Sequence, residues 1–123
     1  MTIIELITDV DAMKPNGHDQ AYKVQWLSQL DGRIKQEIID THEGGEAGTF
    51  EGYNTETPLD TVLLVPAPYD DVYRYWLEAQ IDYANGEYTK YNNSMSMFNN
   101  VYSAYERHYN RTHMPIGKSI KFF

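Results

Sequence analysis

The residues best suited to chemistry are four histidines and a few pairs of acidic side chains. His108 and His113 are five residues apart, which places them on different sides of a helix and does not favour a shared metal ion. His42 and Glu43 precede a Gly-rich turn, where a role at the end of a helix is expected instead. The sequence therefore predicts no metal site.

Glu78 and Asp82 are the acidic pair with helical spacing. Two like charges four residues apart on one face are mildly unfavourable, so we expect both to be solvated unless something binds them. General acid–base catalysis needs a carboxylate in a perturbed environment inside a pocket, and nothing in the sequence locates such a pocket. The sequence also has no Gly-rich phosphate loop, nucleophile elbow or H-E-x-x-H motif. We expect no enzymatic activity and no cofactor.

The most regular pattern is an aromatic stripe near the C-terminal end. Its spacing of three and four residues predicts one long helix to about Thr112, roughly 38 Å long. The stripe lasts only three heptads and lacks flanking charges, so an independent coiled coil is not expected. It either packs inward or partly contacts a neighbouring subunit, as asparagines 92, 93, 99 and 100 would suggest. Its members are Tyr88, Tyr91, Met95, Phe98, Tyr102, Tyr105 and Tyr109.

Three further helices should position this one. Thr2 and Glu5 form a capping-box pattern before a helix of about three turns, which a Lys-Pro-Asn-Gly sequence at 14–17 ends. A second helix should run from about 18 to 40 with Gly32 inside it, either where another backbone approaches or as a tolerated weak point. A third should start by capping at Asp70 and Asp71 and reach Asn85-Gly86, which is either a turn or a kink.

Two segments lack helical periodicity. The long loop at about 44–58 is rich in glycine, and its Phe50 and Tyr53 either anchor it or contact a partner. The run at 61–65 is either an extended segment under the helices or one strand of a minimal sheet. The tail at 115–123 alternates apolar and polar residues, and we expect it to be disordered in a free monomer and ordered on assembly. The candidate interface residues are Phe50, Tyr53, Tyr91, Tyr102, Ile116, Ile120, Phe122 and Phe123.

Composition limits the classes of protein that fit. The 123 residues suit a single domain, 1–123, with a mainly α fold: a small bundle of about four helices with a long C-terminal helix or helical hairpin. The net charge of −8 lies in the first half, which argues against that half gripping nucleic acid. The absence of cysteine excludes disulfides and thiolate metal sites. We expect neither a signal peptide nor a membrane span.

Several stretches together resemble small head–tail connector proteins (head-completion or adaptor proteins) of tailed bacteriophages and Gram-positive prophages. The resemblance covers nearly the whole chain. It is carried by WLSQLDGRI, a helix end at DTHEGG, then LLVPAPYDDVYRYWLEAQIDYANGEYTKYNNSMSMFN, and YNRTHMP.

The resemblance implies a structural virion protein of the head–tail junction, made in the bacterial cytoplasm. Its subunits would form a ring, a dodecamer, beneath the portal protein, extend the DNA channel and dock the next neck or tail protein. DNA would pass without sequence-specific binding, repelled by acids of the 43–56 loop or first helices. Two other functions remain open: a small cytosolic helical adaptor or regulatory module that binds a protein partner, and an enzyme using Glu78, Asp82 and the tyrosines.

Overall fold

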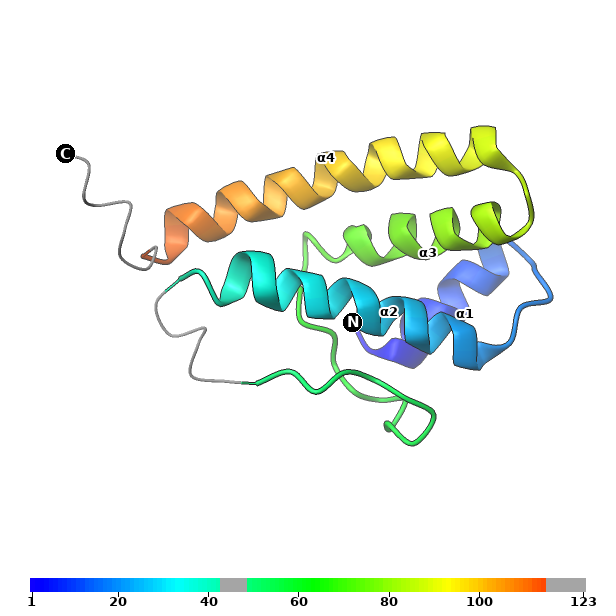
Figure 1. The fold of residues 1–123 in the computed structure, drawn as a ribbon, viewed down its shortest axis with the longest axis horizontal. Helices are drawn as coiled ribbons and strands as arrows, with labels where there is room; N and C mark the ends of the chain where they lie inside the picture. Colours follow the sequence, from blue (N-terminus) through cyan, green and yellow to red (C-terminus); the bar gives the residue numbers. More distant parts are fainter. Residues whose placement is uncertain (43–48, 115–123) are drawn as a thin grey trace.

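The computed structural model describes residues 1–42 and 49–114, which form a mainly helical domain (Figure 1). These residues contain four α-helices: α1 (Ile3–Met13), α2 (Gln20–Ile34), α3 (Asp71–Ala84) and α4 (Tyr88–Thr112). A π-helical segment, η1 (Lys35–Ile39), continues α2. The mainly α fold, the four helices and the long C-terminal helix are therefore confirmed. The tail at 115–123, with its four candidate interface residues, lies outside the described residues.

Local sequence signals fix the ends of α1 and of the α3–α4 hairpin. Thr2 caps α1 with its side chain, and the Glu5 carboxylate accepts from the Thr2 backbone N–H at 2.9 Å, which completes the predicted capping box. Gly86 has a φ of +76°, a conformation that glycine adopts readily. It reverses the chain between α3 and α4, so Asn85-Gly86 is a turn (Figure 1).

The start of α3 differs from the expected cap. Asp70 occupies the N-cap position, but its side chain makes no capping hydrogen bond because its backbone already has helical angles. Asp71 in the first turn forms an ion pair with Arg74 at 3.4 Å and lies at the positive end of the helix dipole. Asp70 and Asp71 therefore contribute charge, and no side-chain cap, to the start of α3.

The helices bury one apolar core, with α3 at its centre. α3 contacts α1, α2 and α4, and it runs antiparallel to α4 (Figure 1). Because α4 has 25 residues and α3 has 14, α4 extends beyond the start of α3 and contacts η1. Fully buried side chains from the four helices meet there: Ile3, Leu6, Leu27, Leu30, Ile34, Tyr73, Leu77, Ile81 and Phe98.

Residues 49–70 connect the two halves of the bundle without forming a helix or a ladder of paired strands. The pairing found among the described residues is one isolated bridge between Thr2 and Val62. Leu63 and Val65 are buried against the helices, so the 61–65 run is an extended core segment rather than a strand of a sheet. The Ala67–Pro68 peptide bond is cis.

Candidate functional site

A buried carboxylate on α2 organises the connecting segment. Asp31 is fully buried, and it accepts hydrogen bonds from the hydroxyls of Tyr53 (2.5 Å) and Tyr73 (2.6 Å) and from the Leu64 backbone N–H (3.2 Å). The Tyr73 hydroxyl in turn accepts from the Val65 N–H at 2.7 Å. Two donors from the connecting segment and one from α3 therefore converge on one side chain.

Burial dominates the electrostatics of this cluster. Desolvation raises the pKa of Asp31, and the hydrogen bonds from Tyr53, Tyr73 and Leu64 oppose that shift. Desolvation and the nearby Asp31 charge also raise the pKa of both tyrosines, which keeps their hydroxyls protonated as donors. The cluster can hold the loop on α2, and its polar atoms are turned toward one another.

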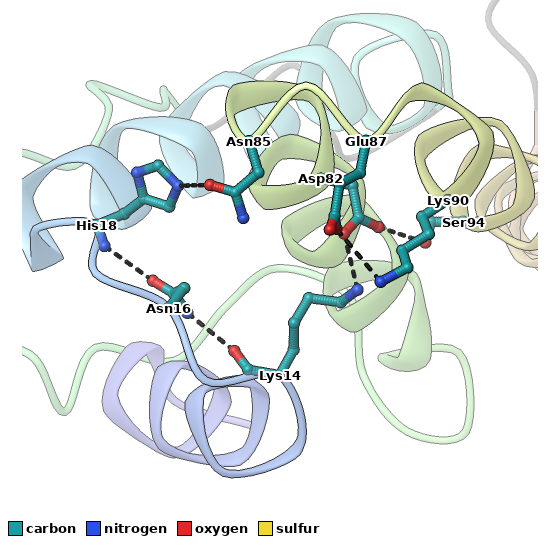
Figure 2. A network of polar contacts seen from close by, with 8 residues as sticks. All are labelled: Lys14, Asn16, His18, Asp82, Asn85, Glu87, Lys90 and Ser94. Carbon is teal, nitrogen blue, oxygen red and sulfur yellow. Dashed lines mark hydrogen bonds and ion pairs between the residues drawn. The ribbon is translucent and has the colours of Figure 1, made fainter.

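A second network lies at the hairpin end of the bundle (Figure 2). Asp82 on α3 is buried and forms an ion pair with Lys14 at 2.7 Å, and the Ser94 hydroxyl on α4 donates to it at 3.5 Å. Asp82 was expected to be solvated unless something binds it, and the loop after α1 brings Lys14 onto it as that partner. Glu78 is half-buried, and desolvation raises its pKa.

Asparagines continue this network toward the turn after α1. The Asn16 side chain donates to the Lys14 carbonyl at 3.0 Å and accepts from the His18 backbone N–H (Figure 2). The His18 ring contacts the Asn85 amide oxygen at 2.9 Å, which connects the α1–α2 loop to the α3–α4 turn. The arrangement joins the α1–α2 loop to the α3–α4 turn through four polar residues: Lys14, Asn16, His18 and Asn85.

His42 performs the predicted helix-end role. Its ring Nδ1 lies 2.6 Å from the Ile38 carbonyl at the end of η1, and its Nε2 lies 2.7 Å from the Asn110 amide oxygen on α4. The ring also meets the Tyr109 ring edge-on at 4.8 Å. Within residues 1–42 and 49–114, no group of three His, Asp or Glu side chains is placed to hold a metal ion.

The predicted interface residues that the structure describes occupy different positions. Tyr53 is half-buried on Asp31, and Phe50 packs on Tyr53 with ring centroids 5.0 Å apart. Phe50 also faces Gly32, so the group that approaches this glycine is a side chain and not a backbone. Of the two roles predicted for Phe50 and Tyr53, anchoring of the loop therefore describes the contacts that they make in the chain.

The aromatic stripe of α4 turns inward over most of its length. Phe98, Tyr102 and Tyr105 are buried, and the Tyr102 hydroxyl donates to Glu37 at 2.7 Å. Tyr91 is half-buried and meets Tyr83 edge-on at 5.2 Å, whereas Tyr88 at the start of α4 is 59% exposed. Inward packing therefore accounts for the middle of the aromatic stripe, whereas the end of the stripe next to the α3–α4 turn faces solvent.

The opposite side of α4 forms an exposed face that we call the outer stripe. Its members recur at helical spacing and none is acidic; between Lys90 and Glu106 the helix has no charged residue at all. Glu106 lies on the flank near Tyr102. Desolvation and Glu37 raise the pKa of Tyr102, and Glu106 adds a smaller contribution. The outer stripe consists of Asn93, Ser96, Asn100, Ser103, Arg107 and Arg111.

Sequence reasoning did not single out Asp31, Lys14 or the outer stripe. For Asp31, the signal was its position on the apolar face of α2, next to Leu30. For the outer stripe, the signal was a run of fifteen residues in α4 without a charged side chain, in a chain of which 23% of the residues are charged. For Lys14 we find no signal, because its partner is 68 residues away.

None of the helices in the described part of the chain is long and apolar enough to cross a lipid bilayer. No protein-family model, curated protein or solved structure matches the chain.

Proposed function

We propose that this protein is a structural subunit of a bacteriophage head–tail connector. Copies of the chain would form a ring of twelve beneath the portal protein, extend the DNA channel and dock the next neck or tail protein. The protein would be made in the bacterial cytoplasm and reside at the head–tail junction of the virion. The motif resemblance over nearly the whole chain suggests this role.

The structural observation that supports the proposal most is the outer stripe of α4. Interface cores are depleted of charged side chains relative to the rest of a protein surface. From Asn93 to Ser103 the stripe offers about three exposed turns of uncharged Asn and Ser residues. Met97, beside the stripe, is 45% exposed. A long neutral helix face on a strongly acidic subunit is suited to contact with another protein.

The internal use of the buried polar groups is also consistent with a structural role. Asp31, Asp82 and His42 each bind partners from distant parts of the chain. Among the described residues, every buried side-chain nitrogen or oxygen has a hydrogen-bond partner. These groups therefore contribute to a defined subunit shape, which a ring requires because each contact must repeat.

The acidic charge supports passage of DNA without retention. Glu51 and Glu56 are exposed in the connecting segment and no ion pair joins either to another described residue. Carboxylates at a channel wall would repel phosphates, whereas retention would need clustered lysine and arginine. We assign part of the channel lining to this segment.

Inactivating the gene tests the proposal. We expect DNA-filled heads that lose DNA and fail to join tails, rescued by the wild-type gene supplied in trans. The gene should also lie beside one for a portal or major capsid protein. Infectious particles of normal yield without the protein would contradict the connector role and favour the adaptor alternative.

A further inference from the structure

The C-terminal end of the outer stripe is basic and partly apolar. Arg107 and Arg111 are exposed, four residues apart on α4, and no ion pair or hydrogen bond joins either side chain to another described residue. Met114, which follows the helix, is 62% exposed. Arg111 also lies at the negative end of the helix dipole, which accounts for its place in the helix but leaves its outer side free. We call these three residues the basic ridge.

An open groove beside α1 has the opposite character. Its volume is about 450 Å³, and three of its lining residues are the acids Glu5, Asp9 and Asp70. Met1 and Ile4 give it an apolar part, each a little over one-third exposed. None of the described residues that line it is a lysine or an arginine. We call it the acidic groove.

The ridge lies at the end of α4, whereas the groove lies mainly beside α1. α3 contacts both α1 and α4, whereas α1 and α4 do not contact each other (Figure 1). Two different patches that bind one another produce a head-to-tail contact, and such a contact closes into a ring when the rotation between subunits allows. A subunit with both patches can therefore add copies at either side.

We propose that the basic ridge of one copy of this chain docks in the acidic groove of the next copy. The inference rests on the proposed function and names its subunit contact. Arg107 and Arg111 would face the groove carboxylates, and Met114 would cover Met1 and Ile4.

Charge selects a second copy as the occupant. Each copy carries a net charge of −8, so most orientations of two copies bring acidic surfaces together. The ridge is an exposed basic patch whose arginines have no partner within residues 1–42 and 49–114, and the groove presents both the charge and the apolar surface that the ridge needs. Complementary charge of this kind fixes register and speeds association.

Association of the purified full-length chain tests the contact. Sedimentation velocity across a concentration series should show oligomers of the wild type at about 20 mM salt and weaker association at about 500 mM, because salt screens exposed charges. Arg107→Glu with Arg111→Glu should weaken association roughly tenfold or more. Asp9→Lys alone should weaken it as well, since Asp9 forms no ion pair with another residue that the structure describes.

A charge-swap variant separates a direct contact from a general effect of charge. Adding Asp9→Lys to the Arg107→Glu, Arg111→Glu variant should restore part of the association. Lys90→Glu and Glu56→Lys are matched controls, because both residues are exposed and neither lies in the ridge or the groove. They should leave association unchanged.

Two results would overturn the inference: a wild type that stays monomeric at every concentration in low salt, or equal effects of the ridge variant and its controls. Neither result decides the connector role, which the gene-inactivation test addresses separately. Conversely, a normal yield of infectious particles without the protein, together with intact ridge–groove association, would exclude the connector role and leave the subunit contact standing.

Discussion

Asp31 shows how a single buried charge can set the position of a whole segment. Its carboxylate is fully buried and accepts from two tyrosines and one backbone amide. A buried carboxylate is costly unless hydrogen bonds compensate it, so each donor is needed for the fold rather than optional.

Removing one of these donors should therefore lower the free energy of unfolding. Tyr73→Phe deletes a hydrogen bond to Asp31 and leaves the Val65 N–H without its acceptor. We expect the free energy of unfolding, measured by urea denaturation, to fall by about 2–4 kcal/mol. Tyr83→Phe is the control on the same helix, because its side chain is 57% exposed, and its change should be close to zero. Equal losses in the two variants would contradict the assigned role.

Glu37 gives a pH dependence of defined sign. The Tyr102 hydroxyl and the Arg33 guanidinium lower the pKa of Glu37 below its usual 4.5. A lowered folded-state pKa means that the contribution to stability is present above pH 4.5 and is lost as the pH falls through the folded value. The gap in urea midpoint between wild type and Glu37→Gln should therefore shrink between about pH 6 and about pH 3.5. A constant gap would show that Glu37 does not titrate with folding.

At the scale of elements, the hairpin turn and the loop after α1 tie the helices together. Gly17 and Gly86 lie in these two connections, and a Cβ would meet nothing within 4 Å at either position. They differ in backbone conformation, since only Gly86 of the two has a positive φ, +76°.

This pair makes a matched test of conformational strain. Gly86→Ala should lower the free energy of unfolding by about 1–2 kcal/mol, because an L-residue resists the left-handed conformation. Gly17→Ala should be neutral or slightly stabilising, since alanine reduces the freedom of the unfolded chain. Chemical denaturation of both variants measures the difference, and a cost of similar size at Gly17 would rule out this explanation.

The ion pair between α3 and the end of α1 predicts a second contrast. Lys14→Met leaves the Asp82 carboxylate, with a side chain 1% exposed, without its cation and should cost roughly 2–4 kcal/mol. Lys90→Met breaks an exposed pair with Glu87 and should cost less than about 1 kcal/mol (Figure 2). Thermal or urea unfolding compares them. Similar small costs in both would mean that water reaches Asp82.

Helix positions could be predicted from the sequence because they depend on local patterns. The capping box at Thr2 and the spacing from Tyr88 to Tyr109 each predicted an observed helix. The change from α2 to η1 was not predicted: the Asp40 N–H donates to the Lys35 carbonyl five residues back, a widening that side-chain periodicity does not reveal.

The candidate sites were less predictable because they depend on contacts between distant segments. Asp82 was expected in solvent unless something binds it, and only the folded chain shows that Lys14 is the residue that does. A contact between Arg107 of one copy and Asp9 of another can be proposed only once the fold shows that their helices, α4 and α1, do not contact each other. Local patterns say which face of a helix is apolar, but they do not say which other segment will cover a charge.

At the scale of the whole molecule, charge is distributed by region. The connecting segment bears exposed acids, while the outer stripe of α4 bears none. In the proposed ring, the connecting segment would face DNA and the outer stripe would face protein.

Reversing charge in the connecting segment tests the first of these surfaces. In assembled particles, Glu51→Lys with Glu56→Lys should slow DNA passage or leave filled heads unstable, because added cations retain phosphates. DNA ejection and the yield of stable heads measure the effect, with Glu51→Gln and Glu56→Gln as a control that removes charge without adding cations. Normal DNA retention and infectivity of the lysine variant would exclude this segment from the channel wall.

The buried Asp31 also has a consequence for how the chain folds during synthesis. Its three donors lie 22, 33 and 42 residues later in the chain, so α2 leaves the ribosome long before they do. Until Tyr73 emerges, burying the apolar face of α2 would strand a charge, and a helix hydrated at that position is favoured. The bundle is thus expected to close late and in one cooperative step. Pulsed hydrogen exchange on refolding chains should show the amides of α2 and α3 gaining protection together.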